Sequence, residues 1–420
     1  MVKGKVVLFY VVGIMVSYLS VECLAYLGLQ LLRHEKDIIY DPIQSSLTPD
    51  QRLILTRQIE NPLTLHTLGK PDPVLGWTVR PNARRDSVRV NSQGIRGDRE
   101  YSPRPAAGTV RVSAFGDSFT FGVDVENGQT WEAQLNRSDP SIEVLNFGVP
   151  AYGVDQAYLR YLADGLRFKS DIVVIGFMSE NIFRHVNVFR PFYSGAYRDS
   201  VFPKPRFTVK DGQLVLLKNP LPATEDLKRF LQDDANVLRE LGEHDYYYQV
   251  GYRRGSLDVS PFLRFLKVTR HGLSVRRDSI VTGGFYNPQS EAFMVTVRIL
   301  EEFYRSVRDN GALPVILIYP DQPDLSTQLS GGRRKYEPLL QVLRARGLRH
   351  IDALDAFVAS DPHYALKDMT VGPWGHYSAR GNRIVADHVL KYLRGADVGV
   401  RASGQGAMAE GRTKERAGRD

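Results

Sequence analysis

Cysteine is the scarcest residue of the chain, since Cys23 is the only one among 420 residues. A single cysteine forms no intramolecular disulfide and no cysteine-based zinc site. The 43% hydrophobic and 24% charged residues are usual for a globular protein and exclude a disordered or collagen-like chain. The sequence also has no internal repeat. Its net charge of +8 comes without a basic block or an aromatic RNA-binding motif, so we expect no nucleic-acid partner.

Apolar residues are too few overall for a polytopic membrane protein, because the mean hydropathy is −0.27. Residues 6–32 are nevertheless a run long enough to cross a bilayer, which takes about 20 apolar residues in a helix. Lys3 and Lys5 precede this run and favour a cytoplasmic N-terminus. We therefore expect residues 1–36 to be a single-pass membrane anchor. The remainder would then be extracytoplasmic, either periplasmic or at the cell surface.

Other interpretations of this segment fit less well. A cleaved signal peptide has a shorter apolar region and a small-residue cleavage site. A lipoprotein modified at Cys23 would have a small residue where Glu22 stands. A buried core helix is rarely this long. Because a carboxylate is costly in lipid, we expect Glu22 to lie near the outer interface or to pair with another helix.

The rest of the chain divides by composition. Residues 37–108 are rich in Pro, Arg, Asn and Asp and indicate a short stalk followed by an irregular prelude. Residues 109–395 alternate apolar runs with segments of helical period. Residues 183–287 interrupt this alternation, and an insertion of about 100 residues is too long for a plain loop, so it indicates a subdomain or lid. Residues 396–420 have no Leu, Ile or aromatic residue and are expected to be disordered.

The alternation within this long segment predicts the fold class. Strand-like apolar runs occupy 109–117, 142–149, 171–178, 313–320 and 349–353. Helix candidates lie near 128–137, 154–168, 288–310, 333–346 and 377–394. Continuous apolar strands between helices are typical of a parallel sheet that is covered on both faces. We therefore expect an α/β fold whose site lies at the carboxyl ends of the strands.

One motif points to chemistry. Residues 116–122 read GDSFTFG and follow the first strand, which places Ser118 on a tight turn with its hydroxyl exposed. Serine is a weak nucleophile until a base takes its proton. The best candidate base is His376, just before the final helix. A developing oxyanion would need donors from the ends of the second and third strands, where residues 146–153 read NFGVPAYG and residues 178–181 read MSEN.

Other candidate residues receive ordinary structural interpretations. Asp117 stands next to the serine and is expected to stabilise the turn rather than to react. The remaining histidines, including His185, His363 and His388, show no grouping with the spacing of metal ligands. No metal site is therefore expected.

Taken in order, these blocks resemble the SGNH (GDSL-type) hydrolases over about 109–182 and 312–394. The resemblance implies a three-layer α/β/α, flavodoxin-like sandwich with a parallel sheet. It also implies ester chemistry, often on acylated carbohydrates, without a metal or organic cofactor. The residues that would match the nucleophile, the base, the side-chain oxyanion donor and the backbone oxyanion donors are Ser118, His376, Asn181 and the N–H groups of Ser118, Gly148, Ala151 and Gly153.

The sequence departs from the family pattern at three places. Pro373 stands three residues before the histidine, where the family often has an aspartate that orients the imidazole. His376 would then act in a Ser–His dyad with a backbone carbonyl, or with Asp368 brought in from eight residues upstream. Ala151 replaces a glycine of the second block. The third block keeps Asn181 but has different neighbours.

Positive charge is concentrated within the insertion. Residues 253–277 hold seven Lys or Arg side chains against one acid, Asp258, and several aromatic residues lie nearby. Three interpretations stay open. The segment could lie on the membrane beside the anchor and contact anionic lipid head groups, it could form a groove for an acidic glycan, or it could be an ordinary solvated face of a lid.

These observations predict a membrane-anchored serine esterase that removes acyl or acetyl groups from a cell-envelope or exported polysaccharide. An O-acyltransferase on the same class of glycan is the alternative, because a sugar hydroxyl can replace water as the acceptor. A non-catalytic glycan-binding or scaffold component of an envelope polysaccharide machinery is an alternative of another class. The three departures from the family pattern motivate this last possibility.

Overall fold

The computed structural model describes residues 2–35, 47–60, 68–193, 202–249, 255–273, 279–372 and 375–395. The predictions for Pro373 and for the tail at 396–420 lie outside these residues. The chain forms two compact units. One, called the sheet unit here, comprises 84–179, 300–333 and 343–420. The other, called the helical unit, comprises 1–83, 180–299 and 334–342.

A five-stranded parallel sheet is the centre of the sheet unit. Its strands, in chain order, are β5 (Val110–Phe115), β6 (Ile142–Asn146), β7 (Ile172–Met178), β12 (Leu313–Tyr319) and β13 (His350–Asp352). They lie side by side in the order β13-β12-β7-β5-β6. Counted along the chain this is 2-1-3-4-5, the flavodoxin-like order of a doubly wound sheet. The five predicted strands and the predicted fold class are therefore confirmed.

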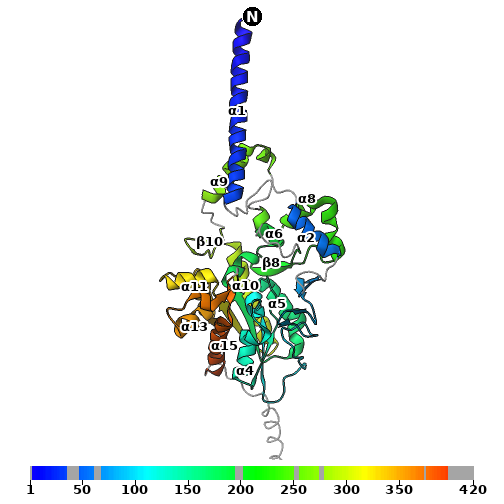
Figure 1. Cartoon of the computed structure of the whole chain (residues 1–420), viewed down its shortest axis with the longest axis vertical. Coiled ribbons are helices and arrows are strands. Elements are labelled where there is room, and N and C mark those ends of the chain that lie inside the picture. The colour runs from blue at the N-terminus through cyan, green and yellow to red at the C-terminus, as the bar shows by residue number, and fades with distance from the viewer. Residues whose placement is uncertain are drawn as a thin grey trace, which may run out of the picture. The chain divides into compact units, whose positions relative to one another are not determined.

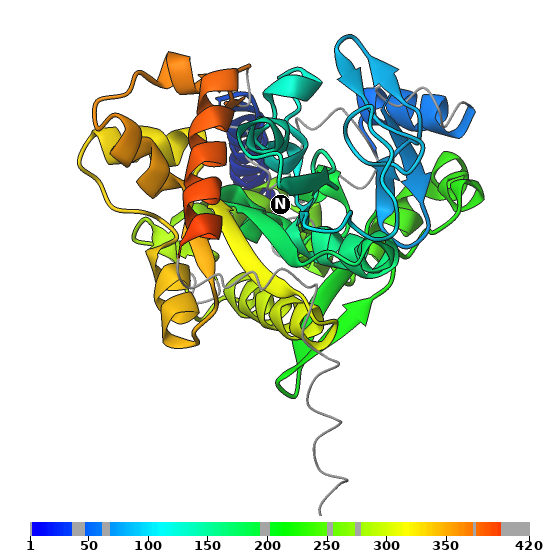
Figure 2. The ribbon, with the colours of Figure 1, turned by 90° about the horizontal axis from the view of Figure 1, so that it is seen from below.

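Helices cover both faces of this sheet (Figure 2). On one face α4 (Trp131–Ser138), α13 (Ala353–Ser360) and α15 (Ala379–Arg394) pack together. On the other face α5 (Val154–Arg160) packs against the C-terminal half of α10 (Glu291–Asp309), where Tyr158 meets the Phe303 ring. Every residue of β7 is buried, which explains why its sequence is a continuous apolar run rather than an alternation.

The predicted helix at 154–168 changes geometry along its length. Helix α5 continues as a π-helical turn at Tyr161–Gly165 and then as a 3₁₀ turn at Leu166–Phe168. Gly165 marks the change, because a Cβ at this position would lie 2.5 Å from the Phe115 ring. The close approach of helix and strand therefore requires glycine here.

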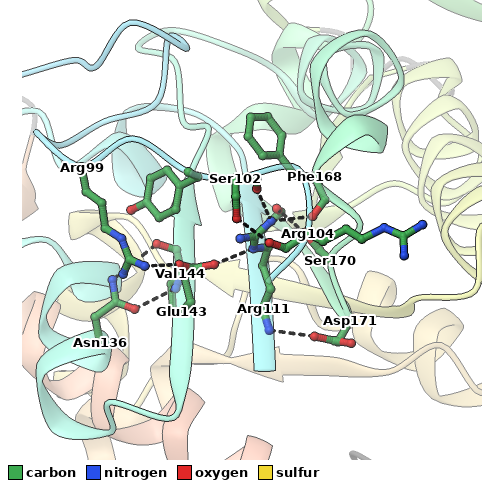
Figure 3. Close-up of polar contacts among 12 residues, drawn as sticks. Arg99, Ser102, Arg104, Arg111, Asn136, Glu143, Val144, Phe168, Ser170 and Asp171 are labelled. Carbon is green, nitrogen blue, oxygen red and sulfur yellow. Dashed lines mark hydrogen bonds and ion pairs between the residues drawn. The ribbon is translucent and has the colours of Figure 1, made fainter. Parts of the chain in front are cut away.

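A buried ion-pair network ties the amino ends of the strands together (Figure 3). The Arg111 side chain is 1% exposed and donates from Nε to Glu143 on the neighbouring strand at 2.6 Å. Its Nη1 donates to the carbonyls of Ser102 at 2.7 Å and Phe168 at 2.8 Å. The Asp171 carboxylate accepts from the Arg111 N–H at 2.8 Å. A buried charge that is paired and hydrogen-bonded to its neighbours fixes the register of β5 against them.

The segment predicted as an irregular prelude contains regular structure. Helix α2 (Pro49–Glu60) begins with a reciprocal pair of hydrogen bonds, since Thr48 Oγ1 accepts from the Gln51 N–H and Gln51 Oε1 accepts from the Thr48 N–H. This is the capping-box pattern, a local signal that identifies a helix start. Four short strands follow, namely β1 (Gly69–Asp72), β2 (Gly76–Val79), β3 (Arg84–Arg85) and β4 (Val88–Arg89).

The insertion at 183–287 contains its own elements. These are α6 (Arg190–Tyr193), β8 (Arg206–Lys210), β9 (Gln213–Leu217), α7 (Thr224–Leu227), α8 (Arg229–Gly242), α9 (Pro261–Leu273), β10 (Val281–Thr282) and β11 (Phe285–Tyr286), with a 3₁₀ turn at Ser256–Val259. Asp245 joins the middle of this region to its beginning. Its buried carboxylate accepts from Asn187 Nδ2 at 2.8 Å and from the Val188 N–H at 2.6 Å, and burial raises its pKa.

Helix α1 (Val2–Glu35) contains the predicted anchor (Figure 1). Residues Gly4–Leu31 have a length and composition that would cross a membrane. Most of their large apolar side chains are exposed in the isolated chain. The same features fit a membrane span or a signal sequence.

Candidate active site

Ser118 occupies the turn that the sequence predicts. Strand β5 ends at Phe115, and the short helix α3 (Ser118–Phe121) begins with the serine itself. Asp117 Oδ1 accepts a hydrogen bond from the Phe119 N–H at 2.9 Å, so this carboxylate caps the turn as predicted. Gly116 leaves no space for a side chain, because a Cβ there would lie 2.1 Å from Thr120 Oγ1. The serine is thereby held at the carboxyl end of a central strand.

His376 lies against this serine. It begins the two-residue strand β15 (His376–Tyr377), which pairs with β14 (Thr370–Val371) just before α15. Its Nε2 is 2.9 Å from Ser118 Oγ. The imidazole also packs against the Phe119 ring, with ring centroids 5.2 Å apart. The nucleophile and base that the sequence proposed are therefore within hydrogen-bond distance although they are 258 residues apart.

Asp124 is the carboxylate beside the histidine. Its Oδ2 is 2.6 Å from His376 Nδ1. Gly372 allows this approach, because its φ is +71° and a Cβ would lie 2.8 Å from the same carboxylate oxygen. The sequence analysis missed Asp124, which stands six residues after Ser118 in the loop that follows α3. No spacing rule from the histidine points to it, since it comes from the opposite end of the chain.

Asp368, the residue expected in this place, is elsewhere. It lies on α14 (Leu366–Met369), and its carboxylate is 3.6 Å from Arg380 Nη1 on α15. Its side chain is 45% exposed. The expectation that Asp368 or a backbone carbonyl orients the imidazole is corrected by the Asp124 contact. Eight residues of separation in sequence do not bring Asp368 to the ring, because its side chain faces Arg380 instead.

The arrangement fixes the roles of the two imidazole nitrogens. An aspartate at Nδ1 holds the proton on that nitrogen, which leaves Nε2 able to accept the serine proton. Ser118 is 7% exposed and His376 is 9% exposed, so both groups are largely shielded from bulk water. A serine, an imidazole and a carboxylate linked in this order can perform nucleophilic acyl transfer.

Two of the four backbone N–H groups predicted as oxyanion donors have other partners. The Gly148 N–H donates to Asn146 Oδ1 at 2.9 Å, and the Gly153 N–H donates to Gln156 Oε1 at 3.3 Å. Gly148 is required for packing, since a Cβ there would lie 2.3 Å from the Phe121 nitrogen. These geometries correct the expectation for Gly148 and weaken it for Gly153.

Ala151 is the second-block residue with unusual backbone geometry. Its φ is +67°, in the left-handed region that an alanine adopts only at a cost of about 1–2 kcal/mol. Non-glycine residues in this region cluster at functional sites. Ala151 therefore stays a predicted donor, and its backbone keeps the conformation that a glycine would take at this position.

Asn181 follows the third strand. It lies in the 3₁₀ helix Ser179–Arg184, which begins directly after β7. The residue is 0% exposed, and within the described part of the chain neither its Oδ1 nor its Nδ2 has a hydrogen-bond partner. A buried amide without a partner is costly, which makes it a candidate for a ligand contact. Asn181 belongs to the helical unit, and its role as an oxyanion donor remains a prediction.

The acidic and histidine side chains of the described residues form no group of three or more that could hold a metal ion. His185 illustrates this, since its Nδ1 lies 2.6 Å from the Thr296 hydroxyl.

Comparison with protein-family models and with curated proteins gives no match. Solved structures give matches of low identity. A lipolytic protein of the G-D-S-L family from Desulfitobacterium hafniense is 14% identical with a TM-score of 0.34, over 68% of this chain and 100% of that one. A catalytic mutant of an acetylxylan esterase from Geobacillus stearothermophilus is 13% identical with a TM-score of 0.33, over 69% and 96%. A GDSL-like lipase from Bacteroides thetaiotaomicron is 9% identical with a TM-score of 0.32, over 69% and 91%.

Proposed function

We propose that the protein is a serine hydrolase of the SGNH type that acts on ester bonds. The observation that carries this proposal is the line of hydrogen bonds from Ser118 Oγ through His376 to Asp124, at 2.9 Å and 2.6 Å. It lies at the carboxyl end of a doubly wound sheet, where such folds place their sites. The GDSFTFG motif that supplies the serine supports the same family.

The mechanism follows from this geometry. Ser118 Oγ attacks the acyl carbonyl carbon while His376 Nε2 takes the hydroxyl proton, and Asp124 stabilises the imidazolium that forms. The tetrahedral intermediate collapses when the imidazolium returns its proton to the leaving alcohol, and the acyl group stays on Ser118. In the second half, His376 takes a proton from an acceptor hydroxyl that attacks the acyl-enzyme, and then returns it to Ser118 Oγ.

Three donors are proposed for the oxyanion. They are the Ser118 N–H, the Ala151 N–H and the side-chain amide of Asn181. Ser118 is the first residue of α3, and the first N–H groups of a helix have no partner within it. The left-handed backbone of Ala151 and the buried amide of Asn181 support the other two. Each such donor typically contributes about 10²–10³ in kcat.

The identity of the acceptor separates two activities. Water gives an esterase, and a sugar hydroxyl gives an O-acyltransferase. We propose hydrolysis first, and transfer as the alternative on the same site. An assembled Ser118, His376 and Asp124 set argues against the non-catalytic scaffold alternative, which the three departures from the family pattern motivated.

We further propose that α1 anchors the chain in a membrane by a single span and that the catalytic unit is extracytoplasmic. The length and hydropathy of residues 4–31 support the span, and Lys3 and Lys5 support the orientation. An acylated polysaccharide of the cell envelope is then the proposed substrate. Reporter fusions placed after residue 40 test the topology, since a cytoplasmic signal would contradict the envelope substrate and leave the esterase proposal intact.

The activity test uses the full chain in detergent. It should hydrolyse a small acetyl ester and react covalently with a fluorophosphonate probe, and Ser118→Ala should lose both. Equal behaviour of the two proteins would refute the catalytic proposal. An acylated glycan donor, supplied with and without an unacylated sugar acceptor, then distinguishes hydrolysis from transfer by whether free acid or acylated acceptor accumulates.

A further inference from the structure

Helix α9 packs directly on the anchor helix within the helical unit (Figure 1). Ala25 and Leu29 are 6% and 5% exposed, whereas the residues of α1 from Gly4 to Leu19 are exposed. Gly28 marks the contact, because a Cβ there would lie 2.9 Å from the Phe265 ring of α9. The C-terminal part of α1 therefore has a protein partner, while its N-terminal part presents apolar side chains on all sides.

Glu22 fastens the two helices. Its carboxylate accepts from the Ser260 hydroxyl at 2.6 Å and from the Phe262 N–H at 2.9 Å. These groups lie at the start of α9, where N–H groups have no partner within the helix and the helix dipole favours a negative charge. The expectation that Glu22 pairs with another helix is met. An acidic residue that interrupts an apolar run thus becomes the cap of a second helix.

The position of this contact along α1 gives its depth. A helix rises about 1.5 Å per residue, so about 20 residues cross the roughly 30 Å of hydrocarbon. Counted from Val6, directly after Lys5, this length ends near Ala25. Glu22 and Gly28 fall on either side of that boundary. Helix α9 is consequently attached at the level where acyl chains give way to head groups.

The free side of α9 is amphipathic. Phe262, Leu263 and Leu266 are 38%, 37% and 46% exposed. Just before the helix, Leu257 and Val259 are 67% and 86% exposed, which is unusual for large apolar side chains in water.

Basic side chains border this apolar cluster. Lys267 and Arg270 are exposed on the adjoining part of the helix surface, and Lys267 Nζ lies 2.9 Å from the Asp258 carboxylate. Lys267 and Arg270 stand four residues after Leu263 and Leu266, so each basic side chain lies one turn further along the same exposed face. Long basic side chains beside apolar ones reach the head groups while the apolar side chains enter the acyl region, as in helices that lie in the membrane interface.

From these contacts we infer that α9 is an interfacial membrane helix. Leu257, Val259, Phe262, Leu263 and Leu266 enter the acyl region beside the anchor, and Lys267 and Arg270 contact anionic lipid head groups. This cluster continues the exposed apolar surface of α1, and we therefore take the lipid bilayer to be what covers it. This inference rests on the proposed membrane anchoring and goes beyond it, because it gives the chain a second attachment that fixes the orientation of the helical unit.

Depth measurements on the full chain in lipid nanodiscs test the inference. In a Cys23→Ser background, a nitroxide is attached separately at Leu266→Cys, at Val12→Cys in the span and at Leu329→Cys on α11 (Gln322–Leu329). Leu329 is 39% exposed and serves as the water-facing control. We expect the ratio of oxygen to nickel-chelate accessibility at position 266 to exceed that at 329 at least threefold and to stay below that at 12.

The outcomes separate the two proposals. A ratio at 266 equal to that at 329, with a high ratio at 12, overturns the interfacial helix and leaves the anchor. A low ratio at 12 overturns the anchor itself. Low accessibility to both reagents at 266 indicates a second copy of the chain on this surface and also overturns the inference.

A matched pair of glycine variants tests the docking. Gly28→Leu and Gly13→Leu make the same change in α1, but a Cβ at Gly13 has no atom within 4 Å among the described residues. With the label at 266, Gly28→Leu should lower the accessibility ratio at least twofold and Gly13→Leu should not. If the two variants behave alike, packing on α1 does not hold α9 in place.

Lipid composition tests the head-group contact. The ratio at 266 should be higher in nanodiscs with about 30% anionic lipid than in purely zwitterionic ones, and the double variant Lys267→Gln, Arg270→Gln should remove the difference. No dependence on anionic lipid, together with binding of an acidic polysaccharide that the double variant loses, would assign these side chains to a glycan and overturn the lipid contact.

Discussion

The two ends of the parallel sheet hold polar networks with opposite properties. At the amino end, the Arg111 side chain is 1% exposed and donates to Glu143 and to two main-chain carbonyls. At the carboxyl end, Ser118, His376 and Asp124 form one line of two hydrogen bonds, and the Asp124 side chain is 34% exposed. The guanidinium at the centre of the first network is buried, whereas the carboxylate that ends the second is partly open to solvent.

This difference separates stability from chemistry. A guanidinium takes no part in proton transfer, so a buried Arg that donates to a glutamate and to two main-chain carbonyls serves to hold strands in place. A serine, an imidazole and a carboxylate can pass a proton along their hydrogen bonds. Changes at the carboxyl end should therefore abolish activity and spare the fold, whereas changes at the amino end should do the reverse.

Replacing the nucleophile should have the largest effect. Ser118→Ala is expected to lower kcat for a small acetyl ester by about 10⁴-fold or more, because no other group of the site can form the acyl-enzyme. The free energy of unfolding in denaturant should stay within about 0.5 kcal/mol of that of the original protein. A large loss of stability would contradict the division between the two ends.

The Asp124 contact gives the next largest effect. Asp124→Asn should lower kcat between about 10²- and 10⁴-fold, because an amide neither fixes the imidazole tautomer nor stabilises the imidazolium. Asp368→Asn is the matched control, and we expect less than a threefold change since its carboxylate faces Arg380. Steady-state kinetics on both variants decides the matter, and the reverse ranking would restore Asp368 as the orienting residue.

At the amino end, Arg111→Met should destabilise the protein by about 3–5 kcal/mol, the usual cost of breaking a buried ion pair. Its control is Arg383→Met on α15, whose exposed pair with Asp387 should contribute less than about 1 kcal/mol. Unfolding of both variants by guanidinium measures the difference. The kcat of folded Arg111→Met should remain within about threefold of the original value. A larger fall would show that the network at the amino end of the sheet also affects catalysis at its carboxyl end.

The stability contributions of two buried glutamates should respond differently to pH. Burial raises the pKa of Glu132 on α4 well above its ordinary value, whereas Glu143 is paired with Arg111 and Arg99. A raised folded-state pKa means that the folded protein binds more protons than the unfolded chain between the two pKa values. The contribution of Glu132 to the free energy of unfolding is therefore fully present below its unfolded-state pKa. This contribution is lost as the pH rises toward its folded-state pKa.

We accordingly expect Glu132→Gln to be more stable than the original protein at pH 8 and to show a smaller loss of stability between pH 5 and 8. Glu143→Gln should be less stable at both values, since it loses two ion pairs. Thermal unfolding at the two pH values tests both variants. A Glu132→Gln protein that is destabilised at pH 8 would show that this carboxylate is ionised and paired in the folded state.

The smallest expected effect is at Ala151. Glycine adopts a φ of +67° without the steric cost of alanine, but it loses more entropy on folding. Ala151→Gly should therefore change stability by no more than about 1 kcal/mol and keep kcat within about threefold. Ala151→Val, which is β-branched, should lower both. Equal effects of the two substitutions would mean that the backbone conformation at this position does not matter.

Local signals predicted much of this structure. The apolar runs predicted all five strands of the sheet, because a strand buried on both faces is continuous in sequence. The GDSFTFG motif and the residue before the last helix predicted Ser118 and His376. The capping box at Thr48 and Gln51 was an equally local signal for α2. The composition of this segment, which is rich in Pro, Arg, Asn and Asp, favoured an irregular structure instead.

Long-range partners could not be predicted in this way. Asp124 and His376 are 252 residues apart in the chain. Only the packing of the loop that follows α3 against the start of β15 selects Asp124 over Asp368. The Gly148 N–H was assigned to an oxyanion, yet the Asn146 side chain accepts it. Which hydrogen bond a group makes depends on all the donors and acceptors near it in space, and the sequence does not show which groups these are.

The sequence by itself determined the doubly wound fold, the apolar helix at the N-terminus and the choice of Ser118 and His376 as candidates, because periodicity and short motifs are properties of neighbouring residues. Only the tertiary structure decided that Asp124 completes the hydrogen-bonded line and that Glu22 caps α9. Both assignments join elements far apart in the chain. Their energies come from burial and hydrogen bonding that exist only once those elements have packed.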